Sequence, residues 1–501
     1  MTHPLVTRNS STPGLPALVE REQRWTWEGL FEETSRYAMA LHETLGVGEG
    51  SRIATYLEGS STHVMLIHAV GLLGAVIIPF HRRWTAREVE EAARLTGTHV
   101  LVTDPPAARH FRRANMPDTC FVSVDERGNL HGLPAKRRSG PSLREAIDAF
   151  HLLDENSIAV ILPTSGSTGH PKFVPLTWAN LRAAAKASDA NLRTGISDNW
   201  LCPLPLSHTG GLSILYRAVF SGCAVTLSGG ASPADLARTI RAGAVTIVSL
   251  VPLLLRRVMD ADPSLTAHEC TSLRAILLGG AAAPRTVIEE ARRRSLPVLL
   301  TYGLTEAGSQ VATMKPGDRL EIGCVGKPLP GFTVEIRDAG GRGLSHGMKG
   351  DIWIGGPAVF SGYLDGGDAE RFSGGMFKTG DTGFFDALGR LHVVGRSDDM
   401  IVSGGENISP EEIEDVLRAL PGMEDACIVG LPDEEWGETV AALVVPERGE
   451  EDFERLREEC HRVLAPFKVP KRWLSARAVP LTESGKPDRE AVRRLFLTPG
   501  C

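Results

Sequence analysis

A loop of hydroxyl, glycine and lysine residues directly follows a short apolar segment and carries the strongest chemical signal in the sequence. From Pro163 to Lys172 it reads Pro-Thr-Ser-Gly-Ser-Thr-Gly-His-Pro-Lys. Glycines let backbone N–H groups approach an anion, while hydroxyls and a lysine add donors and positive charge, so the loop suits a polyphosphate. It lacks the GxxxxGK[ST] spacing of the Walker loop, and a flexible polar turn is the alternative. The candidate phosphate-binding residues are Thr164, Ser165, Gly166, Ser167, Thr168, Gly169 and Lys172.

A second polar group follows another apolar run, in the sequence Leu-Thr-Tyr-Gly-Leu-Thr-Glu from Leu300 to Glu306. Tyr302 offers a ring face for a nucleotide base, and Thr305 offers a hydroxyl donor. Glu306 offers the hard oxygen that Mg²⁺ prefers. An ordinary strand-to-helix turn, with Glu306 in the first turn of the helix, is the alternative.

Three later turns carry further candidates, each of which could alone be a solvated turn. Lys378-Thr-Gly-Asp381 places a carboxylate that could accept both hydroxyls of a ribose. A glycine-rich segment runs from Gly395 to Asn407, and Thr482–Arg489 carries Lys486 on a glycine turn.

The elements that must position these residues alternate between strand and helix, which favours βαβ units and a mainly parallel sheet. Short apolar runs predict buried strands at 52–56, 75–79, 100–103, 158–162, 245–250 and 275–278. Helices are predicted at 30–45, 178–188 with Thr177 as N-cap, 212–220, 233–242 and 285–294. The basic stretch 105–142 is weakly periodic, and we expect surface or irregular structure there.

The pattern changes after Gly323, where glycine and β-formers predict strands at 333–336, 350–354 and 390–394 in an antiparallel or barrel-like segment. Helix signals return at 410–420 and 451–464. We therefore expect a large domain over 1–395 and a small C-terminal domain over 396–501, with the boundary near 396–398.

Composition excludes several classes of protein. The chain has 501 residues, 42% of them hydrophobic and 23% charged, which is typical of soluble globular proteins and not of disordered chains. The formal charge, 54 − 61 = −7, disfavours nucleic-acid binding. We expect no transmembrane segment, because no run approaches 18 uncharged apolar residues, and no secretion signal at the start. The eight cysteines form no CxxC pair, so free thiols in a cytoplasmic protein are expected.

Taken together, in this order and at these spacings, the five motifs resemble those of the acyl-adenylate-forming superfamily of acyl- and aryl-CoA ligases, adenylation domains and luciferases. The resemblance covers nearly the whole chain, from Trp25 to Lys486. It implies an α/β fold whose large N-terminal domain has stacked αβαβα sheets and a small β-barrel-like subdomain. A small, mobile α+β C-terminal domain follows.

The resemblance also implies a reaction in two halves, in which ATP first adenylates a carboxylic acid and coenzyme A then displaces AMP. The phosphate loop would hold the β- and γ-phosphates, Glu306 would bind Mg²⁺, and Thr305 would contact the α-phosphate. Lys486 would neutralise carboxylate and phosphate as they approach. Asp398 would be the hinge about which the small domain rotates, bringing Ser403, Gly404 and Gly405 to the coenzyme A channel. The remaining implied ATP-binding residues are Gly279, Gly280, Ala281, Tyr302, Gly303, Asp381 and Arg396.

Within the superfamily, the chain looks like the o-succinylbenzoate–CoA ligases of menaquinone biosynthesis. The likeness rests on the stretches 202–217, 245–252 and 273–284, and on Gly308-Ser-Gln310. It places His208 beside the acyl group, where a packing histidine is the alternative. Arg217, nine residues after His208, would suit a substrate with a second carboxylate. In one straight helix its side chain would point about half a turn away from that of His208. A surface or interdomain salt bridge is the alternative role for Arg217.

Two residues depart from the family pattern, namely Pro163 before the phosphate loop and Phe173 after Lys172. Neither change removes a phosphate contact, but both leave the identity of the acid substrate undetermined. The other possibilities are a CoA ligase for another aryl or medium-chain acid, or an adenylating enzyme that loads a carrier-protein thiol. A non-catalytic sensor is disfavoured because Glu306, Asp381, Arg396 and Lys486 are all present. A serine hydrolase is disfavoured because the sequence has no GxSxG elbow. A homodimer is one option for the assembly.

Overall fold

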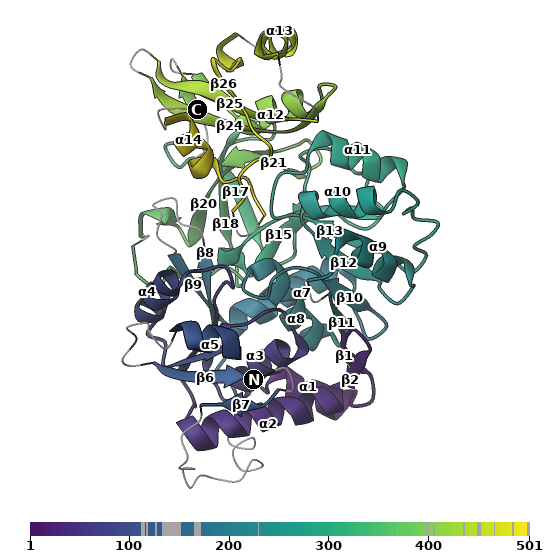
Figure 1. The fold of residues 1–501 in the computed structure, drawn as a ribbon, viewed down its shortest axis with the longest axis vertical. Coiled ribbons are helices and arrows are strands. Elements are labelled where there is room, and N and C mark those ends of the chain that lie inside the picture. The colour runs from purple at the N-terminus through teal and green to yellow at the C-terminus, as the bar shows by residue number, and fades with distance from the viewer. Residues whose placement is uncertain are drawn as a thin grey trace.

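The computed structural model describes most of the chain, and its helices and strands are arranged around two large sheets (Figure 1). The described residues are 1–111, 116, 119–125, 128–132, 152–164, 172–228, 230–367, 369–396, 401–403, 406–433, 436–447, 452–464, 466–482 and 485–497. The mixed α/β architecture, with a large N-terminal part and a small C-terminal part, confirms the fold class predicted above.

The first sheet has seven strands in the order β7-β6-β5-β3-β4-β8-β9. Its central strands are parallel, and an antiparallel neighbour closes each edge. The bounds are β3 Arg52–Tyr56, β4 Val76–Pro79, β5 Val100–Thr103, β6 Cys120–Val124, β7 Leu130–His131, β8 Ile158–Thr164 and β9 Lys172–Thr177.

The second sheet has nine strands in the order β16-β15-β14-β13-β12-β10-β11-β1-β2. It is parallel from β14 to β1 and antiparallel at both ends. The bounds are β1 Pro16–Glu20, β2 Gln23–Thr26, β10 Asn199–Cys202, β11 Ala224–Leu227, β12 Ile247–Leu250, β13 Ala275–Leu278, β14 Val298–Leu304, β15 Ser309–Thr313 and β16 Lys327–Pro328.

Helices cover these sheets (Figure 1), with α3, α7 and α8 in the middle and α9, α10 and α11 on the far side of the second sheet. Helix α7 begins where the sequence predicts. The Thr177 side chain accepts a hydrogen bond from the Asn180 N–H, and the Asn180 side chain accepts one from the Thr177 N–H. The bounds are α1 Pro4–Ser11, α2 Trp27–Leu45, α3 Ser61–Leu72, α4 Ala86–Thr96, α5 Pro105–Phe111, α7 Trp178–Leu192, α8 Thr209–Ser221, α9 Pro233–Arg241, α10 Pro252–Ala261 and α11 Arg285–Arg293.

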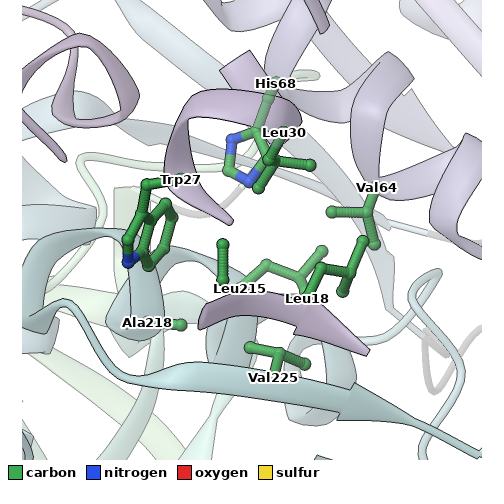
Figure 2. Close-up of a pocket in the computed structure, with 9 residues that line it drawn as sticks. Leu18, Trp27, Leu30, Val64, His68, Leu215, Ala218 and Val225 are labelled. Carbon is green, nitrogen blue, oxygen red and sulfur yellow. The ribbon is translucent and has the colours of Figure 1, made fainter. Parts of the chain in front are cut away.

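A small apolar cavity lies between α2, α3, α8 and the strands β1 and β11 (Figure 2). Its walls include Trp27, His68, Leu215 and Val225, and its volume is roughly 10 Å³, room for about one water. Leu215 lies six residues after Thr209 on α8. At about 100° per residue this is a rotation of about 600°, or 240° beyond a full turn, so the two side chains leave different faces of the helix. The cavity is therefore distinct from the polar side of α8 described below.

The C-terminal third builds two further sheets, one antiparallel and one antiparallel except for β26, which runs parallel to β25. One has the order β17-β18-β20-β19 with β21 beside β20, and the other has β23-β22-β25-β24 with β26 beside β25. The first sheet comprises β17 Thr333–Arg337, β18 Gly350–Gly355, β19 Phe372–Ser373, β20 Met376–Phe385 and β21 Leu391–Arg396. The second comprises β22 Ile401–Ser403, β23 Glu406–Ile408, β24 Met423–Asp433, β25 Gly437–Pro446 and β26 Arg472–Ser475, with α12 Pro410–Arg418, α13 Phe453–Val463 and α14 Arg489–Leu497.

The apolar cores of these parts are separate. The main core gathers residues from Leu5 to Leu391, whereas the buried residues from Ile401 to Val492 form two clusters of their own. Polar contacts join the two parts, since Arg256 of α10 donates to the Glu424 carbonyl at 3.0 Å. The small part also packs on β21 and lies at the top of Figure 1.

One expectation about the fold was wrong. The stretch 105–142 was predicted to be surface or irregular, yet residues 120–124 form β6, parallel to β5, with Val122 and Val124 buried. The flanking prolines, glycines and basic residues hid this five-residue strand. The seven cysteines within the described residues are free, as predicted, and six of them are buried. Over the same residues, no helix is long and apolar enough to cross a membrane.

Candidate active site

One group of predicted nucleotide-binding residues lies where β13 and β14 end, at the carboxyl edge of the second sheet, an edge that commonly binds ligands in α/β proteins. Gly279, Gly280 and Ala281 follow β13, and the last two are exposed. Gly279 packs so closely on β14 that an added Cβ would lie 2.6 Å from the Thr301 methyl group and 2.8 Å from its carbonyl oxygen. A residue without a side chain is therefore required there.

Tyr302, Asp381 and Arg396 are brought together from β14, β20 and β21. The Tyr302 hydroxyl donates to Asp381 at 2.6 Å, and Arg396 lies opposite Asp381 in the sheet with Nε 3.8 Å from its carboxylate. Burial, with the adjacent Asp381 carboxylate, raises the pKa of Tyr302 well above its ordinary value. Tyr302 is only 8% exposed, so its observed task is to hold Asp381, and its stacking on a base stays a prediction.

Glu306 is held in place by a tyrosine that the sequence did not single out. Tyr363 donates to the Glu306 carboxylate at 2.6 Å, and the Lys172 ammonium lies 4.7 Å from the centre of the same ring. The Phe360 N–H also donates to the Glu306 carbonyl at 2.8 Å. The segment 360–363 thus links the predicted metal ligand to the lysine of the phosphate loop.

The Glu306 carboxylate fits Mg²⁺ that arrives with a nucleotide. Within the described residues, no group of three or more His, Cys, Asp or Glu side chains could hold a metal ion. Mg²⁺ is usually bound by one or two carboxylates together with substrate phosphates and waters, so one half-buried carboxylate is a sufficient protein ligand.

Most of the phosphate loop lies outside the described residues, and so do three of the other candidates. Ser165, Gly166, Ser167, Thr168 and Gly169 belong to that group, as do Asp398, Gly404 and Gly405. The two ends of the loop are described: Thr164 and Lys172 face each other across β8 and β9, and the Thr164 hydroxyl donates to the Lys172 carbonyl at 3.3 Å. Ser403, the described residue of the expected coenzyme A channel, is buried in β22.

His208 stands at the N-cap of α8 beside a second histidine. Its ring centre is 5.1 Å from that of His81, and its Nε2 is buried with no hydrogen-bond partner among the described residues. Burial, His81 and the positive charge of Lys486 together lower the pKa of His208 to about 4. His208 is therefore neutral near pH 7, and Lys486 lies close enough to act on it electrostatically.

A tight turn presents Lys486. The Thr482 N–H donates to the Lys486 carbonyl at 2.7 Å, and the Lys486 N–H donates to the Thr482 hydroxyl at 3.2 Å. Gly485 closes the turn with φ +78°, a conformation that a side chain would strain. Lys486 belongs to the small part and His208 to the large part, so the charge of Lys486 acts on His208 across the boundary between the two parts.

Arg217 is not brought next to His208. It lies nine residues further along α8, about 13 Å at 1.5 Å per residue, with its guanidinium 5.7 Å from the centre of the Trp200 ring. Burial lowers the pKa of Arg217 to about 10, while the Asp189 carboxylate of α7 acts in the opposite direction. Burial likewise raises the pKa of Asp189 to about 7.

Comparison with known proteins identifies the family. Residues 5–364 match the model of the AMP-binding enzymes, and residues 412–486 match the model of their C-terminal domain. The chain belongs to the AMP-binding enzyme family. A 2-succinylbenzoate–CoA ligase of Bacillus licheniformis is 35% identical over 97% of this chain and 98% of its own length.

Solved structures of AMP-binding enzymes share the fold. The o-succinylbenzoate CoA synthetase of Bacillus subtilis, in complex with its acyl-adenylate OSB-AMP, is 29% identical with a TM-score of 0.85 and 98% coverage of both chains. ATP-bound MatB of Rhodopseudomonas palustris is 26% identical with a TM-score of 0.88 and 99% coverage of both chains. The predicted superfamily and the resemblance to o-succinylbenzoate–CoA ligases are thus confirmed.

In this AMP-binding enzyme, sequence reasoning missed residues that hold the predicted ones in place. Tyr363 contacts Glu306, His81 contacts His208, and Thr209 donates to the Thr305 hydroxyl at 2.8 Å. The Thr379 hydroxyl accepts from the Asp381 N–H at 3.0 Å. Thr379 belongs to the Lys-Thr-Gly-Asp motif, which was predicted to be a turn but lies within the strand β20, and it could have been found there. No local signal marks Tyr363.

Proposed function

We propose that this AMP-binding enzyme is a 2-succinylbenzoate–CoA ligase, which converts 2-succinylbenzoate, ATP and coenzyme A into 2-succinylbenzoyl-CoA, AMP and diphosphate. The observation that carries the proposal is the Thr209–Thr305 hydrogen bond, which joins the start of α8, where His208 is the N-cap, to the Thr305–Glu306 turn. The positive charge of Lys486 acts on His208 at the same place. The relationship over nearly the full length to a ligase named for this acid supports the choice of substrate. By the resemblance described above, the product would serve menaquinone biosynthesis.

In the first half-reaction, a carboxylate oxygen of the acid attacks the α-phosphorus of ATP, and the bond to diphosphate breaks. Both reactants are anions, so the protein must position them and neutralise charge. We assign charge neutralisation to Lys486, a hydrogen bond to the α-phosphate to Thr305, and the β- and γ-phosphates to the loop from Thr164 to Lys172. Mg²⁺ held by Glu306 would screen the phosphate charge. The ribose is assigned to Asp381 and Arg396, and the base to the surface formed by Gly279, Gly280, Ala281, Tyr302 and Gly303.

In the second half-reaction, the thiol sulfur of coenzyme A attacks the activated carbonyl carbon, AMP leaves with the bonding electron pair, and the thiol proton is released. We propose that the domain of residues 396–501 turns about Asp398 between the halves, withdrawing Lys486. The turn would bring Ser403, Gly404 and Gly405 to the thiol channel, where glycines leave room for a thin chain. Separate apolar cores on the two sides favour such a rotation, because no shared core has to be broken.

A polar strip inside the large domain supports a substrate with a second carboxylate. Thr209, Ser213 and Arg217 follow one another at four-residue intervals along α8, and β15, which carries Gln310, packs on the same helix. Ser213 Oγ, both amide atoms of Gln310, and Nε and Nη2 of Arg217 are buried without hydrogen-bond partners among the described residues. Buried polar groups gain free energy when a ligand pairs with them, so we keep Arg217 and His208 as the acyl-contacting residues.

Mass spectrometry of thioester products tests the proposal. The protein is incubated with ATP, Mg²⁺, coenzyme A and, separately, 2-succinylbenzoate, benzoate, 2,3-dihydroxybenzoate, octanoate or acetate. The expected result is a coenzyme A ester of 2-succinylbenzoate at far higher kcat/KM than for the other acids. An ester with another acid keeps the mechanism and rejects the substrate, whereas diphosphate release without an ester points to a carrier-protein thiol.

A variant of Arg217 tests the acyl assignment in the same assay. Arg217→Ala is expected to raise KM for 2-succinylbenzoate while leaving KM for benzoate analogues unchanged. An equal rise for both acids would refute recognition of the second carboxylate. A cytoplasmic location and a homodimer remain proposals, which fractionation and light scattering respectively would test.

A further inference from the structure

The Thr209–Thr305 hydrogen bond joins two segments that are 96 residues apart in the sequence. Thr209 is the first residue of α8 and is 9% exposed, whereas Thr305 begins the half-buried turn that carries Glu306. The Thr209 hydroxyl is the donor and the Thr305 hydroxyl the acceptor, with the two oxygens 2.8 Å apart. We propose that Thr209 is a positioning residue, which orients the Thr305 hydroxyl toward the α-phosphate during adenylation; this inference rests on the proposed function.

The direction of this hydrogen bond determines where the Thr305 proton points. A threonine hydroxyl has one donor and two acceptor sites. Because Thr209 donates, it occupies an acceptor site of Thr305 and leaves the Thr305 proton for another partner. None of the described residues accepts that proton. Accepting a bond also polarises the Thr305 hydroxyl and makes it a stronger donor, which suits an anionic phosphate oxygen.

Thr209 is held firmly enough to act in this way. The N–H groups of Gly211 and Leu212 donate to the His208 carbonyl at 3.1 and 2.9 Å, which closes the first turn of α8. Gly211 packs directly on the preceding loop, where an added Cβ would lie 2.4 Å from the Pro205 carbonyl oxygen. Thr209 therefore cannot shift without the whole helix start.

Thr305 is fixed equally well from its own side. Its carbonyl accepts from the Gly308 N–H at 3.0 Å, and Gly308 ends the turn with φ +62°. The Phe360 N–H holds the next carbonyl, that of Glu306, at 2.8 Å. The backbone is thus fixed at both Thr209 and Thr305, which holds the two hydroxyls in contact. The Thr305 proton can then be donated to a phosphate oxygen.

The competing explanation is that the bond only ties α8 to the Thr305–Glu306 turn and contributes to stability. The variant Thr209→Val distinguishes the positioning role from a purely structural role, because valine keeps the branched shape of threonine and removes the hydroxyl donor. Diphosphate exchange into ATP, with the acid as substrate, measures adenylation, and thermal unfolding measures stability. We expect Thr209→Val to lower kcat for exchange about tenfold with little change in KM for ATP, and Thr209→Ser to recover the rate to within about threefold.

Two further measurements complete the test. Thioester formation from preformed adenylate should change less than about twofold in Thr209→Val, and the double variant with Thr305→Ala should be no slower than Thr305→Ala alone. The matched control is Thr226→Val, which removes a hydroxyl that donates to Asn199 Oδ1 at 2.9 Å in the same sheet and should leave exchange unchanged.

Each outcome is decisive. Full exchange activity in Thr209→Val, or losses that add to those of Thr305→Ala, would overturn the positioning role while the proposed function stands. A Thr209→Ser variant as slow as Thr209→Val would also overturn it, because serine keeps the donor. Wild-type protein that exchanges no diphosphate with any acid in the panel would overturn the proposed function itself.

Discussion

Gly303→Ala should displace the Thr305–Glu306 turn, because the added Cβ would collide with main-chain atoms of the neighbouring strand. Gly303 lies in β14 one residue after Tyr302 and two before Thr305, at an irregularity in the pairing with β15. An added Cβ would lie 1.7 Å from the Ser309 carbonyl oxygen, 2.5 Å from its carbon and 3.0 Å from the Gln310 Cα. These are main-chain atoms, so no side-chain rotation can relieve the overlap.

The size of the effect follows from the displacement required. Raising the closest contact from 1.7 Å to 3.0 Å, the lower limit of real Cβ contacts, moves one strand by 3.0 − 1.7 = 1.3 Å relative to the other. A misplacement of about 1 Å near reacting groups costs about 100-fold in rate, or roughly 2.7 kcal/mol of transition-state stabilisation. Overpacking lowers the free energy of unfolding by about 1–3 kcal/mol in addition.

Diphosphate exchange gives the rate, and thermal unfolding gives the stability of the same preparation. The matched control is Gly195→Ala, where nothing lies within 4 Å of the added Cβ and the backbone is outside the left-handed region. We expect the control to retain exchange within about twofold, and Gly303→Ala to lose about 100-fold. Exchange by Gly303→Ala within threefold of wild type, at an unchanged Tm, would refute the reasoning.

Three further predictions concern charge. Lys486→Ala should abolish most adenylation and spare thioester formation from preformed adenylate; equal loss of both halves in rapid-quench assays would contradict its role. Glu414→Ala should lower the free energy of unfolding by about 3–5 kcal/mol in urea titrations, because it removes the closer of the two carboxylates, Glu414 and Glu411, that pair with the buried Arg489 guanidinium. Glu490→Ala, at an exposed pair, should cost less than about 1 kcal/mol. Burial lowers the pKa of His63 and His68 from 6.5 to about 4, so the unfolded chain takes up these protons first. Stability is therefore constant above about pH 6.5, falls as pH drops from 6.5 to about 4, and levels off below that. The loss at pH 5 is about 2 kcal/mol per histidine, and a folded His68→Leu variant should lose about half of this acid sensitivity in urea unfolding.

The elements that sequence reasoning predicted best are those with local signals. Thr177 marked the start of α7 because a hydroxyl followed by Asn180 makes a reciprocal cap, which needs only four residues. Buried parallel strands such as β4 and β13 were found because they are continuous apolar runs. Asp381 and Arg396 come from two separate sequence motifs, and the structure places them opposite each other in β20 and β21.

The pairings between distant segments could not be predicted in this way. Tyr363 reaches Glu306 over 57 residues, and Thr209 reaches Thr305 over 96, so no short window of sequence contains both partners. Arg217 shows the limit of helical periodicity: its spacing from His208 was known, but its neighbours Trp200 and Asp189 belong to other elements. The strand β6 was missed because its flanks carry the composition of a surface loop.

The position of β1 in the second sheet bears on how the chain emerges from the ribosome. One edge of β1 pairs with β2, which follows at once, but the other edge pairs Leu18 with Val225, which is synthesised 225 − 18 = 207 residues later. At roughly 5–20 residues per second, that delay is about 10–40 s. Strands β3, β4 and β5 can pair with one another well before then, whereas the apolar residues Ala17 and Leu18 remain uncovered. Slow translation before β11 would therefore prolong the time for which this edge of the amino-terminal strand is unpaired.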